Sequence, residues 1–318
     1  RRSGHLVALG IHQQLFVELF AGAQARHLDF HVYVRLITIE PDQPGGQVHD
    51  FDRLTHIQHK DLAALCERAR SGVEVKIIFD DFGNLTRFSD ASLQALQDAG
   101  VEVEVFNPVH RYVNRIYFNY RDHRKIAVID GLYAYTGGIN IADEYANLFV
   151  RFGHWKDTAV MLSGEAVRGF TLMFLQMWNI TERQPEDYAK YLTEKQPGFS
   201  RKDGYIIPYG DSPFDHENVG EEVYFHILNH AKKYVHIMTP YLILDNEMLT
   251  TLIRAAKSGI EVIIIMPHIP DKWYAFAVAK TYYKELIEGG VQIYEYTPGF
   301  VHAKIFVSDD DTARSEER

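Results

Sequence analysis

The feature that most constrains the fold of this 318-residue chain is an internal repeat. The matched segments are 69–81 with 256–268, 99–108 with 289–298 and, more weakly, 25–34 with 231–240. In the first pair, ARSGVEVKIIFDD aligns with AKSGIEVIIIMPH, and both combine a helix end, a glycine and an apolar β-rich run. Such self-similarity predicts two halves that fold alike.

Helical patterns alternate with the strand-like runs of the repeat. SDASLQALQDAG at 89–100 and NEMLTTLIRAAKSG at 246–259 are amphipathic segments that lie between apolar runs. This alternation predicts an α/β fold with two mixed β-sheets flanked by helices. We place the boundary in the polar stretch that ends the first half, which gives residues 1–203 and 204–318.

Each half ends in the same short pattern of chemistry-bearing residues. The first half has HRKIAVIDGLYAYTGGIN, with His123, Lys125 and Asp130, and the second has HAKIFVSD, with His302, Lys304 and Asp309. In a strand, a His and a Lys two positions apart point to one face, where both can reach one phosphate. The recurrence of the spacing at the same place in a repeat predicts two half-sites.

The residue types suit phosphoryl transfer without a metal or another cofactor. One His can attack phosphorus while the other protonates the leaving oxygen, because imidazole titrates near neutral pH. The lysines supply positive charge, and Asn140 can add a hydrogen bond as charge builds at phosphorus. For Asp130 and Asp309 we favour a supporting role, bracing the turn at a strand end, over direct chemistry.

Composition narrows the function classes. The formal net charge of −10 and the pI near 5.9 disfavour a nucleic-acid partner held through its phosphates. The single cysteine, Cys66, excludes an intramolecular disulfide and a Cys-rich zinc site. No run of about 18 apolar residues is present, so the sequence predicts no membrane-spanning helix.

The doubled His-x-Lys-x4-Asp pattern, followed in its first copy by GGIN, resembles the phospholipase D superfamily. Further segments are similar to bacterial cardiolipin synthases, namely DDFGN, GGINIADEY, PYGDSPFD, IMTPYLILDNEML and PGFVHAK. The resemblance implies a duplicated phospholipase D-type fold with the active site at the pseudo-two-fold interface. It also implies phosphatidyl transfer between two phosphatidylglycerol molecules, through a phosphatidyl-histidine, to give cardiolipin and glycerol.

The resemblance assigns roles within this pattern. It implies that His123 is the nucleophile and His302 the acid/base, although the near-symmetry of the repeat leaves the reverse assignment open. It implies an acid that orients the opposite His, and HWKDTAVMLSG makes Asp157 the candidate partner of His302, with a plain surface Asp as the competing interpretation. Gly138 and Asn140 of GGIN are the other expected supporting residues.

The resemblance also bears on the membrane. It implies a parent protein at the cytoplasmic face of the cell membrane, and the start without Met reads as an excised segment. A second Gly-Ser/Thr-x-Asn is expected from position 316, where the chain ends in ARSEER, so we expect impaired activity of this fragment.

The Arg- and aromatic-rich segment 109–122 suits either a lipid headgroup boundary or a domain interface. Segment 272–290 reads first as a helix covering the core and second as a lipid-facing one.

Two other function classes compete with phosphatidyl transfer. A phosphodiesterase would use the same histidines with water as acceptor, on phospholipid or, against the acidic charge, on nucleic acid. A non-catalytic binding module would have lost part of the pattern, whereas both copies are complete through the Asp. The sequence sets no oligomeric state.

Overall fold

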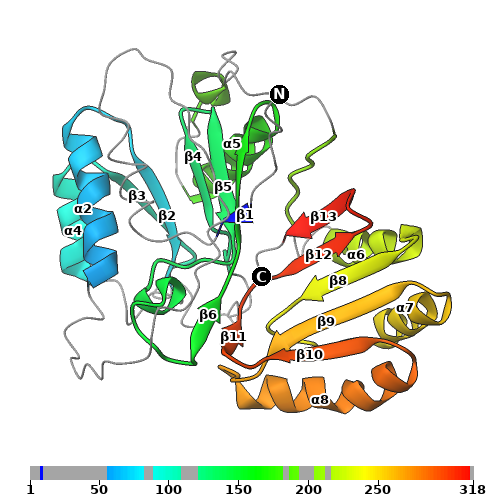
Figure 1. Cartoon of the computed structure of the whole chain (residues 1–318). Coiled ribbons are helices and arrows are strands. Elements are labelled where there is room, and N and C mark those ends of the chain that lie inside the picture. The colour runs from blue at the N-terminus through cyan, green and yellow to red at the C-terminus, as the bar shows by residue number, and fades with distance from the viewer. Residues whose placement is uncertain are drawn as a thin grey trace, which may run out of the picture. The chain divides into compact units, whose positions relative to one another are not determined.

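The structure is a computed structural model that describes residues 8–9, 56–81, 89–108, 121–181, 186–192, 204–211 and 216–315. The chain divides into two compact units: 1–136 with 141–143 and 161–208, and 137–140 with 144–160 and 209–318. Two short pieces that precede the expected boundary at residue 203 therefore cluster with the later part of the chain. Both units mix helices and strands (Figure 1), as the alternating pattern predicts.

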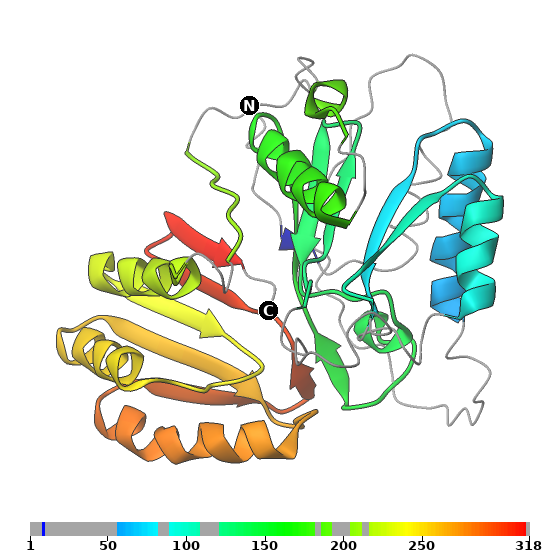
Figure 2. The same ribbon diagram turned by 180° about the vertical axis from the view of Figure 1, so that it is seen from behind.

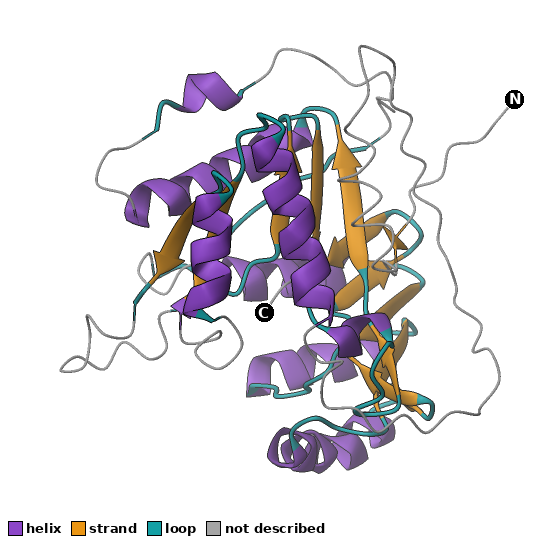
Figure 3. Cartoon of the chain, turned by 90° about the vertical axis from the view of Figure 1, so that its left-hand side faces the viewer, coloured by secondary structure: helices purple, strands orange, loops and turns teal. Residues whose placement is uncertain are grey.

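In its described residues, the first unit combines two sheets with three longer helices. Its elements are β1 (Ala8–Leu9), α2 (His56–Arg70), β2 (Lys76–Asp80), α4 (Asp90–Asp98), β3 (Glu102–Phe106), β4 (Ile126–Ile129), β5 (Tyr133–Gly137), β7 (Ala159–Ser163), α5 (Ala166–Thr181) and the 3-10 helix η4 (Tyr188–Tyr191). One sheet has the order β1-β7-β5-β4, and β2 pairs with β3 in parallel. Helices α2 and α4 lie side by side (Figure 3) and enclose a small core around Cys66 and Leu96.

The second unit is built on one five-stranded sheet. Its elements are β6 (His154–Lys156), α6 (Val219–His230), β8 (Tyr234–Met238), α7 (Asn246–Lys257), β9 (Glu261–Pro267), α8 (Trp273–Glu288), β10 (Gln292–Tyr296), β11 (Gly299–Val301), β12 (Ile305–Ser308) and β13 (Thr312–Ser315); the 3-10 helix η3 (Asp143–Ala146) joins the units in sequence. The sheet order is β10-β9-β8-β12-β13. Figure 2 shows α6, α7 and α8 over one face, where Val235, Val262 and Ile264 are fully buried.

The predicted repeat is confirmed down to strand register. In the first unit Lys76 lies opposite Glu102, and in the second Ile263 lies opposite Gln292. Lys76 and Ile263 are equivalent in the repeat, as are Glu102 and Gln292. The hairpin that follows each motif is repeated too, since β4 and β5 pair antiparallel as β12 and β13 do. The weaker match of 25–34 to 231–240 involves residues outside the described ones.

The glycines that follow the equivalent helices α2 and α7 have nearly identical geometry. Gly72 follows α2 with φ +92°, and Gly259 follows α7 with φ +91°. In both, the next residue's N–H bonds back to the helix, from Val73 to the Arg68 carbonyl at 3.1 Å and from Ile260 to that of Ala255 at 3.2 Å. This left-handed cap favours glycine because a Cβ would be strained there. It turns the chain from the helix toward the strand that follows, β2 or β9.

The expected helix over 272–290 is confirmed as α8, with Ala275, Ala279 and Leu286 buried against the core. Across the described parts of the chain, no helix is both long enough and apolar enough to cross a bilayer. The segment 109–122 lies outside the described residues except for its last two, Arg121 and Asp122.

Candidate active site

The second motif is held by a short parallel pairing between distant parts of the chain. Strand β11 pairs with β6 so that Val301 lies opposite Lys156, and both residues directly precede the functional side chains. His302 and Asp157 then meet, with Nδ1 of the imidazole 2.8 Å from a carboxylate oxygen of Asp157. The sequence-predicted partners therefore lie in contact, across 145 residues of chain.

Asp157 is itself fixed and buried. One carboxylate oxygen accepts the backbone N–H of Thr158 at 2.8 Å, and the other is 3.4 Å from the Trp155 indole nitrogen as well as bonded to His302. Only 6% of Asp157 and 8% of His302 are exposed. A carboxylate at Nδ1 favours the proton on that nitrogen, which favours one tautomer of the imidazole.

Lys304 folds back over His302. Its Nζ lies 3.3 Å from Nδ1 and 3.2 Å from Nε2 of the imidazole, and it donates to the His302 carbonyl at 2.7 Å. The lysine is also buried, with 8% exposed. A desolvated ammonium beside an imidazole edge is a binding point for a phosphate oxygen, because charge-assisted hydrogen bonds are strong in a low dielectric.

The prediction that each His–Lys pair lies inside a strand is wrong. His302 and Lys304 precede β12, and His123 and Lys125 precede β4. In the second motif the N–H groups of His302 and Ala303 both approach the Lys156 carbonyl, at 2.7 and 3.2 Å. Because two residues of one segment lie opposite one residue of the other, the regular ladder of hydrogen bonds is interrupted, as in a β-bulge. Such irregularities change the direction in which side chains point.

The first motif repeats the local His–Lys geometry. Lys125 Nζ lies 2.9 Å from Nδ1 and 3.2 Å from Nε2 of His123, and 2.5 Å from the His123 carbonyl oxygen. Asp80, at the end of β2, accepts the Asp122 N–H at 3.1 Å and pairs with Arg121 at 2.6 Å, which anchors the approach to this motif. Here, however, His123 is exposed, unlike His302.

The motif aspartates lie at strand ends, as the bracing interpretation expects. Asp130 and Asp309 follow β4 and β12 with left-handed φ angles of +53° and +56°. Asp309 accepts the backbone N–H groups of Lys232, Lys233 and Tyr234 at 2.7, 2.9 and 3.0 Å. The N–H of Tyr234 is the main cause that lowers the pKa of Asp309. Asp309 therefore ties the motif to the start of β8.

The two glycines of GGIN make room for the Asp157 segment. A Cβ on Gly138 would lie 2.3 Å from a carboxylate oxygen of Asp157, and one on Gly137 would lie 2.4 Å from the Thr158 carbonyl. Asn140 donates from Nδ2 to the Tyr145 hydroxyl at 2.5 Å. The supporting role expected of Gly138 thus has a steric form: it lets Asp157 occupy its position.

Comparison with known proteins follows the same motifs. The family described as "Cardiolipin synthase, PLD-like domain" matches residues 53–178 and 224–314, which contain both His-x-Lys-x4-Asp patterns. The chain belongs to this family.

Relatives of this PLD-like domain include cardiolipin synthases. The chain is 35% identical over 285 residues to the "Cardiolipin synthase" of Alkalihalophilus pseudofirmus, covering 90% of this chain and 54% of the relative. It is 33% identical to that of Geobacillus sp. (96% and 63%), and 54% identical to an "Uncharacterized protein" of Streptococcus mutans (78% and 53%). The chain spans about half the length of the curated relatives it matches.

Among solved structures, the phosphatidylserine synthase of Haemophilus influenzae is similar with a TM-score of 0.45 and 15% identity, over 79% of this chain and 74% of that one.

Sequence reasoning missed the aromatic surroundings of His302 in this PLD-like domain. The rings of Tyr145, Trp155 and Phe300 lie 5.3, 5.4 and 5.8 Å from the imidazole, centroid to centroid. Phe300 and Trp155 are paired in the β11–β6 register. The sequence does contain a signal for these rings, because an aromatic residue lies two positions before His302, in FVH, and two positions before Asp157, in WKD.

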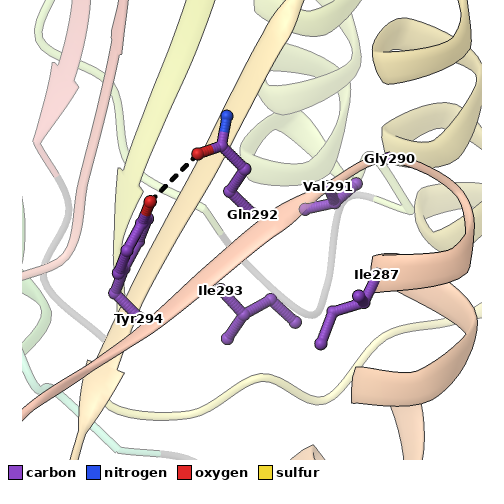
Figure 4. Close-up of a pocket in the computed structure, with 6 residues that line it drawn as sticks. All are labelled: Ile287, Gly290, Val291, Gln292, Ile293 and Tyr294. Carbon is purple, nitrogen blue, oxygen red and sulfur yellow. Dashed lines mark hydrogen bonds between the residues drawn. The ribbon is translucent and has the colours of Figure 1, made fainter.

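A separate pocket of the PLD-like domain, between the end of α8 and β10, lacks these groups. Figure 4 shows its lining, which consists of Ile287, Gly290, Val291, Gln292, Ile293 and Tyr294. It offers no His, Lys or carboxylate for phosphoryl transfer. Within the described residues, no group of His, Cys, Asp and Glu is arranged to hold a metal ion.

Proposed function

We propose that this chain supplies the catalytic groups for phosphatidyl transfer from one phosphatidylglycerol to the terminal hydroxyl of a second, giving cardiolipin and glycerol. Family membership supports the reaction class, and the buried Asp157–His302–Lys304 arrangement is the observation that carries the proposal. This arrangement combines an oriented imidazole with a phosphate-binding ammonium. Those are the two elements that general acid/base catalysis at phosphorus needs.

The proposed reaction has two displacements at phosphorus. His123 attacks the phosphodiester, a P–N bond forms, and the P–O bond to glycerol breaks as His302 gives the leaving oxygen its proton. The second phosphatidylglycerol then loses a hydroxyl proton to His302 while its oxygen attacks phosphorus and releases His123. Lys125, Lys304 and Asn140 stabilise the charge on the non-bridging oxygens, and Asp157 stabilises the imidazolium.

The proposal also covers the location of the substrate, the motif aspartates and the two halves of the chain. The substrate is taken from a membrane surface at its cytoplasmic face, and the reaction uses no cofactor. Asp130 and Asp309 act as supporting residues at the strand ends. The two functional halves are residues 1–203 and 204–318.

The test is a product analysis on the full-length protein that carries this chain, with phosphatidylglycerol in mixed micelles. We expect cardiolipin and glycerol in equal amounts, and loss of both with His123→Ala or His302→Ala. His236→Ala is the matched control, since His236 is a partly exposed histidine of β8 paired with Glu261 at 2.8 Å. Phosphatidic acid as the main product would replace the transferase by a hydrolase, and activity retained in both variants would refute the mechanism.

A further inference from the structure

A tyrosine and an aspartate meet at the carboxyl ends of two neighbouring parallel strands. Tyr241 follows β8, Asp271 follows β9, and the Tyr241 hydroxyl donates to a carboxylate oxygen of Asp271 at 2.6 Å. Burial raises the pKa of Tyr241, and the hydrogen bond to Asp271 raises it further. The phenol therefore stays protonated and serves Asp271 as a fixed donor.

The second oxygen of Asp271 has no such donor. Oδ1 is buried and accepts no hydrogen bond among the described residues. Nor does the carboxylate cap the following helix, because α8 begins at Trp273 and the cap position, Lys272, makes no side-chain cap bond. A buried carboxylate oxygen without a donor opposes folding. The fold thus gives no reason for this acceptor, whereas a ligand that donates a hydrogen bond would.

The acceptor lies on a loop that is bonded to the strand leading to His302. The N–H groups of His268 and Ile269 lie 3.2 and 3.3 Å from the Gly299 carbonyl, which fixes the loop after β9 beside β11. Strand β11 leads directly to His302. On the other side, Tyr145 is near enough to Tyr241 to influence its pKa, and its ring meets the His302 imidazole edge-on at 5.3 Å.

The charges at this position match a hydroxyl attached near a phosphate. Lys272 Nζ lies 4.9 Å from the Tyr241 ring, and the lysine is exposed. An anionic acceptor and a neighbouring cation together suit a ligand with a hydroxyl donor and a phosphodiester a few bonds apart. The carboxyl ends of parallel strands are also where α/β sheets bind ligands.

We propose that Asp271, held by Tyr241, binds a hydroxyl of the glycerol headgroup of phosphatidylglycerol. The proposal rests on the proposed function and names a headgroup subsite within it. Donor and acceptor lipids present the same glycerol hydroxyls, so the chemistry is shared and the experiment separates the two sources. The expected consequence is a preference for polyols over simple alcohols as acceptors.

The experiment measures that preference in the full-length protein. Phosphatidylglycerol is the donor, and labelled glycerol competes with 1-propanol, so that the ratio of labelled phosphatidylglycerol to phosphatidylpropanol reports selectivity. We expect Asp271→Ala to lower the ratio about tenfold, as for loss of one charged hydrogen bond. Asp271→Asn keeps an uncharged acceptor, so its ratio should lie between those of the wild-type protein and Asp271→Ala. The Asn variant also tests the proposal if the Ala variant does not fold. Tyr241→Phe, which leaves Oδ1 in place, should have a smaller effect.

A second arm identifies the source. With phosphatidylpropanol as donor and water as acceptor, no glycerol headgroup is present, so a rate loss confined to phosphatidylglycerol donors assigns Asp271 to the leaving headgroup. A loss confined to glycerol acceptors assigns it to the incoming one.

Failure of the proposed function and failure of the Asp271 inference give different results. If the wild-type protein transfers no phosphatidyl group, the proposed function fails. If it does, and Asp271→Ala slows glycerol and 1-propanol equally with an unchanged ratio, Asp271 is structural and the inference is overturned.

Discussion

The two His-x-Lys-x4-Asp motifs are alike in themselves and different in their surroundings. In both, the lysine Nζ contacts both imidazole nitrogens and the histidine carbonyl, and the aspartate adopts a left-handed φ. Yet His123 is exposed, whereas His302 is buried against Asp157 and three aromatic rings. The eight residues of each motif thus determine its local geometry. The carboxylate that contacts the buried imidazole comes from a segment 145 residues away.

The difference suits unequal chemical roles. An imidazole fixed by a buried carboxylate has one tautomer and a stabilised charged form, as a proton donor to a leaving oxygen requires. An exposed imidazole is accessible to an incoming phosphodiester. We therefore favour His302 as the acid/base and His123 as the nucleophile.

The largest expected effect is the difference between the two histidine variants when the lipid donor carries an activated leaving group. A p-nitrophenyl phosphatidyl ester has a leaving group that needs no proton, so His302→Ala should still release p-nitrophenol in a burst. His123→Ala lacks the nucleophile, so its rate of p-nitrophenol release should fall at least about 10⁴-fold. Stopped-flow absorbance of p-nitrophenol on both variants measures this.

The reverse pattern, a burst in His123→Ala and none in His302→Ala, would exchange the two roles. The ordinary donor phosphatidylglycerol is the control, because its poor leaving group should make both variants inactive.

The next effect concerns the orienting carboxylate. Asp157→Asn removes the charge that fixes the His302 tautomer, and we expect kcat to fall about 100-fold with a smaller change in KM. Trp155→Phe removes the long contact from the indole nitrogen but keeps an aromatic ring beside His302, and should cost far less. Steady-state kinetics on the lipid donor separates the two parameters. An Asp157→Asn variant that lost activity through KM alone would contradict an orienting role.

Much of this fold follows from the sequence, and the part that does not has a physical cause. The repeat, its capping glycines Gly72 and Gly259, and the positions of β2 and β9 follow from local patterns. The location of His302 and Lys304 ahead of a strand does not, because the shared Lys156 carbonyl that interrupts the ladder is contributed by a distant strand. The Asp157 contact was predictable only through resemblance, since residue spacing cannot encode the β6–β11 pairing.

A smaller effect is expected at Gly138. In Gly138→Ala the new Cβ would lie 2.3 Å from an Asp157 oxygen, so the carboxylate must move away from His302. We expect about a tenfold loss of kcat and about 1–3 kcal/mol of stability. The double variant Gly138→Ala/Asp157→Ala is the control, because with the carboxylate gone the added methyl group should cost little more activity than Asp157→Ala alone. Additive losses would mean that Gly138 acts independently of Asp157.

The smallest effect separates the two motif aspartates by stability. Glycine relieves a left-handed φ but loses the carboxylate, so Asp130→Gly should change stability by less than about 1 kcal/mol. Asp309→Gly should lower the melting temperature, because three backbone N–H groups lose their acceptor.

The same contrast should appear against pH. The hydrogen bonds lower the pKa of Asp309 in the folded protein, so its contribution is present above the unfolded value of about 3.9 and is lost as pH falls through the folded pKa. Thermal unfolding from pH 7 to pH 3 should therefore show a steeper acid loss in the wild-type protein and in Asp130→Gly than in Asp309→Gly. If all three proteins lose stability in parallel, the Asp309 carboxylate does not brace the fold, and the two strand-end aspartates are equivalent after all.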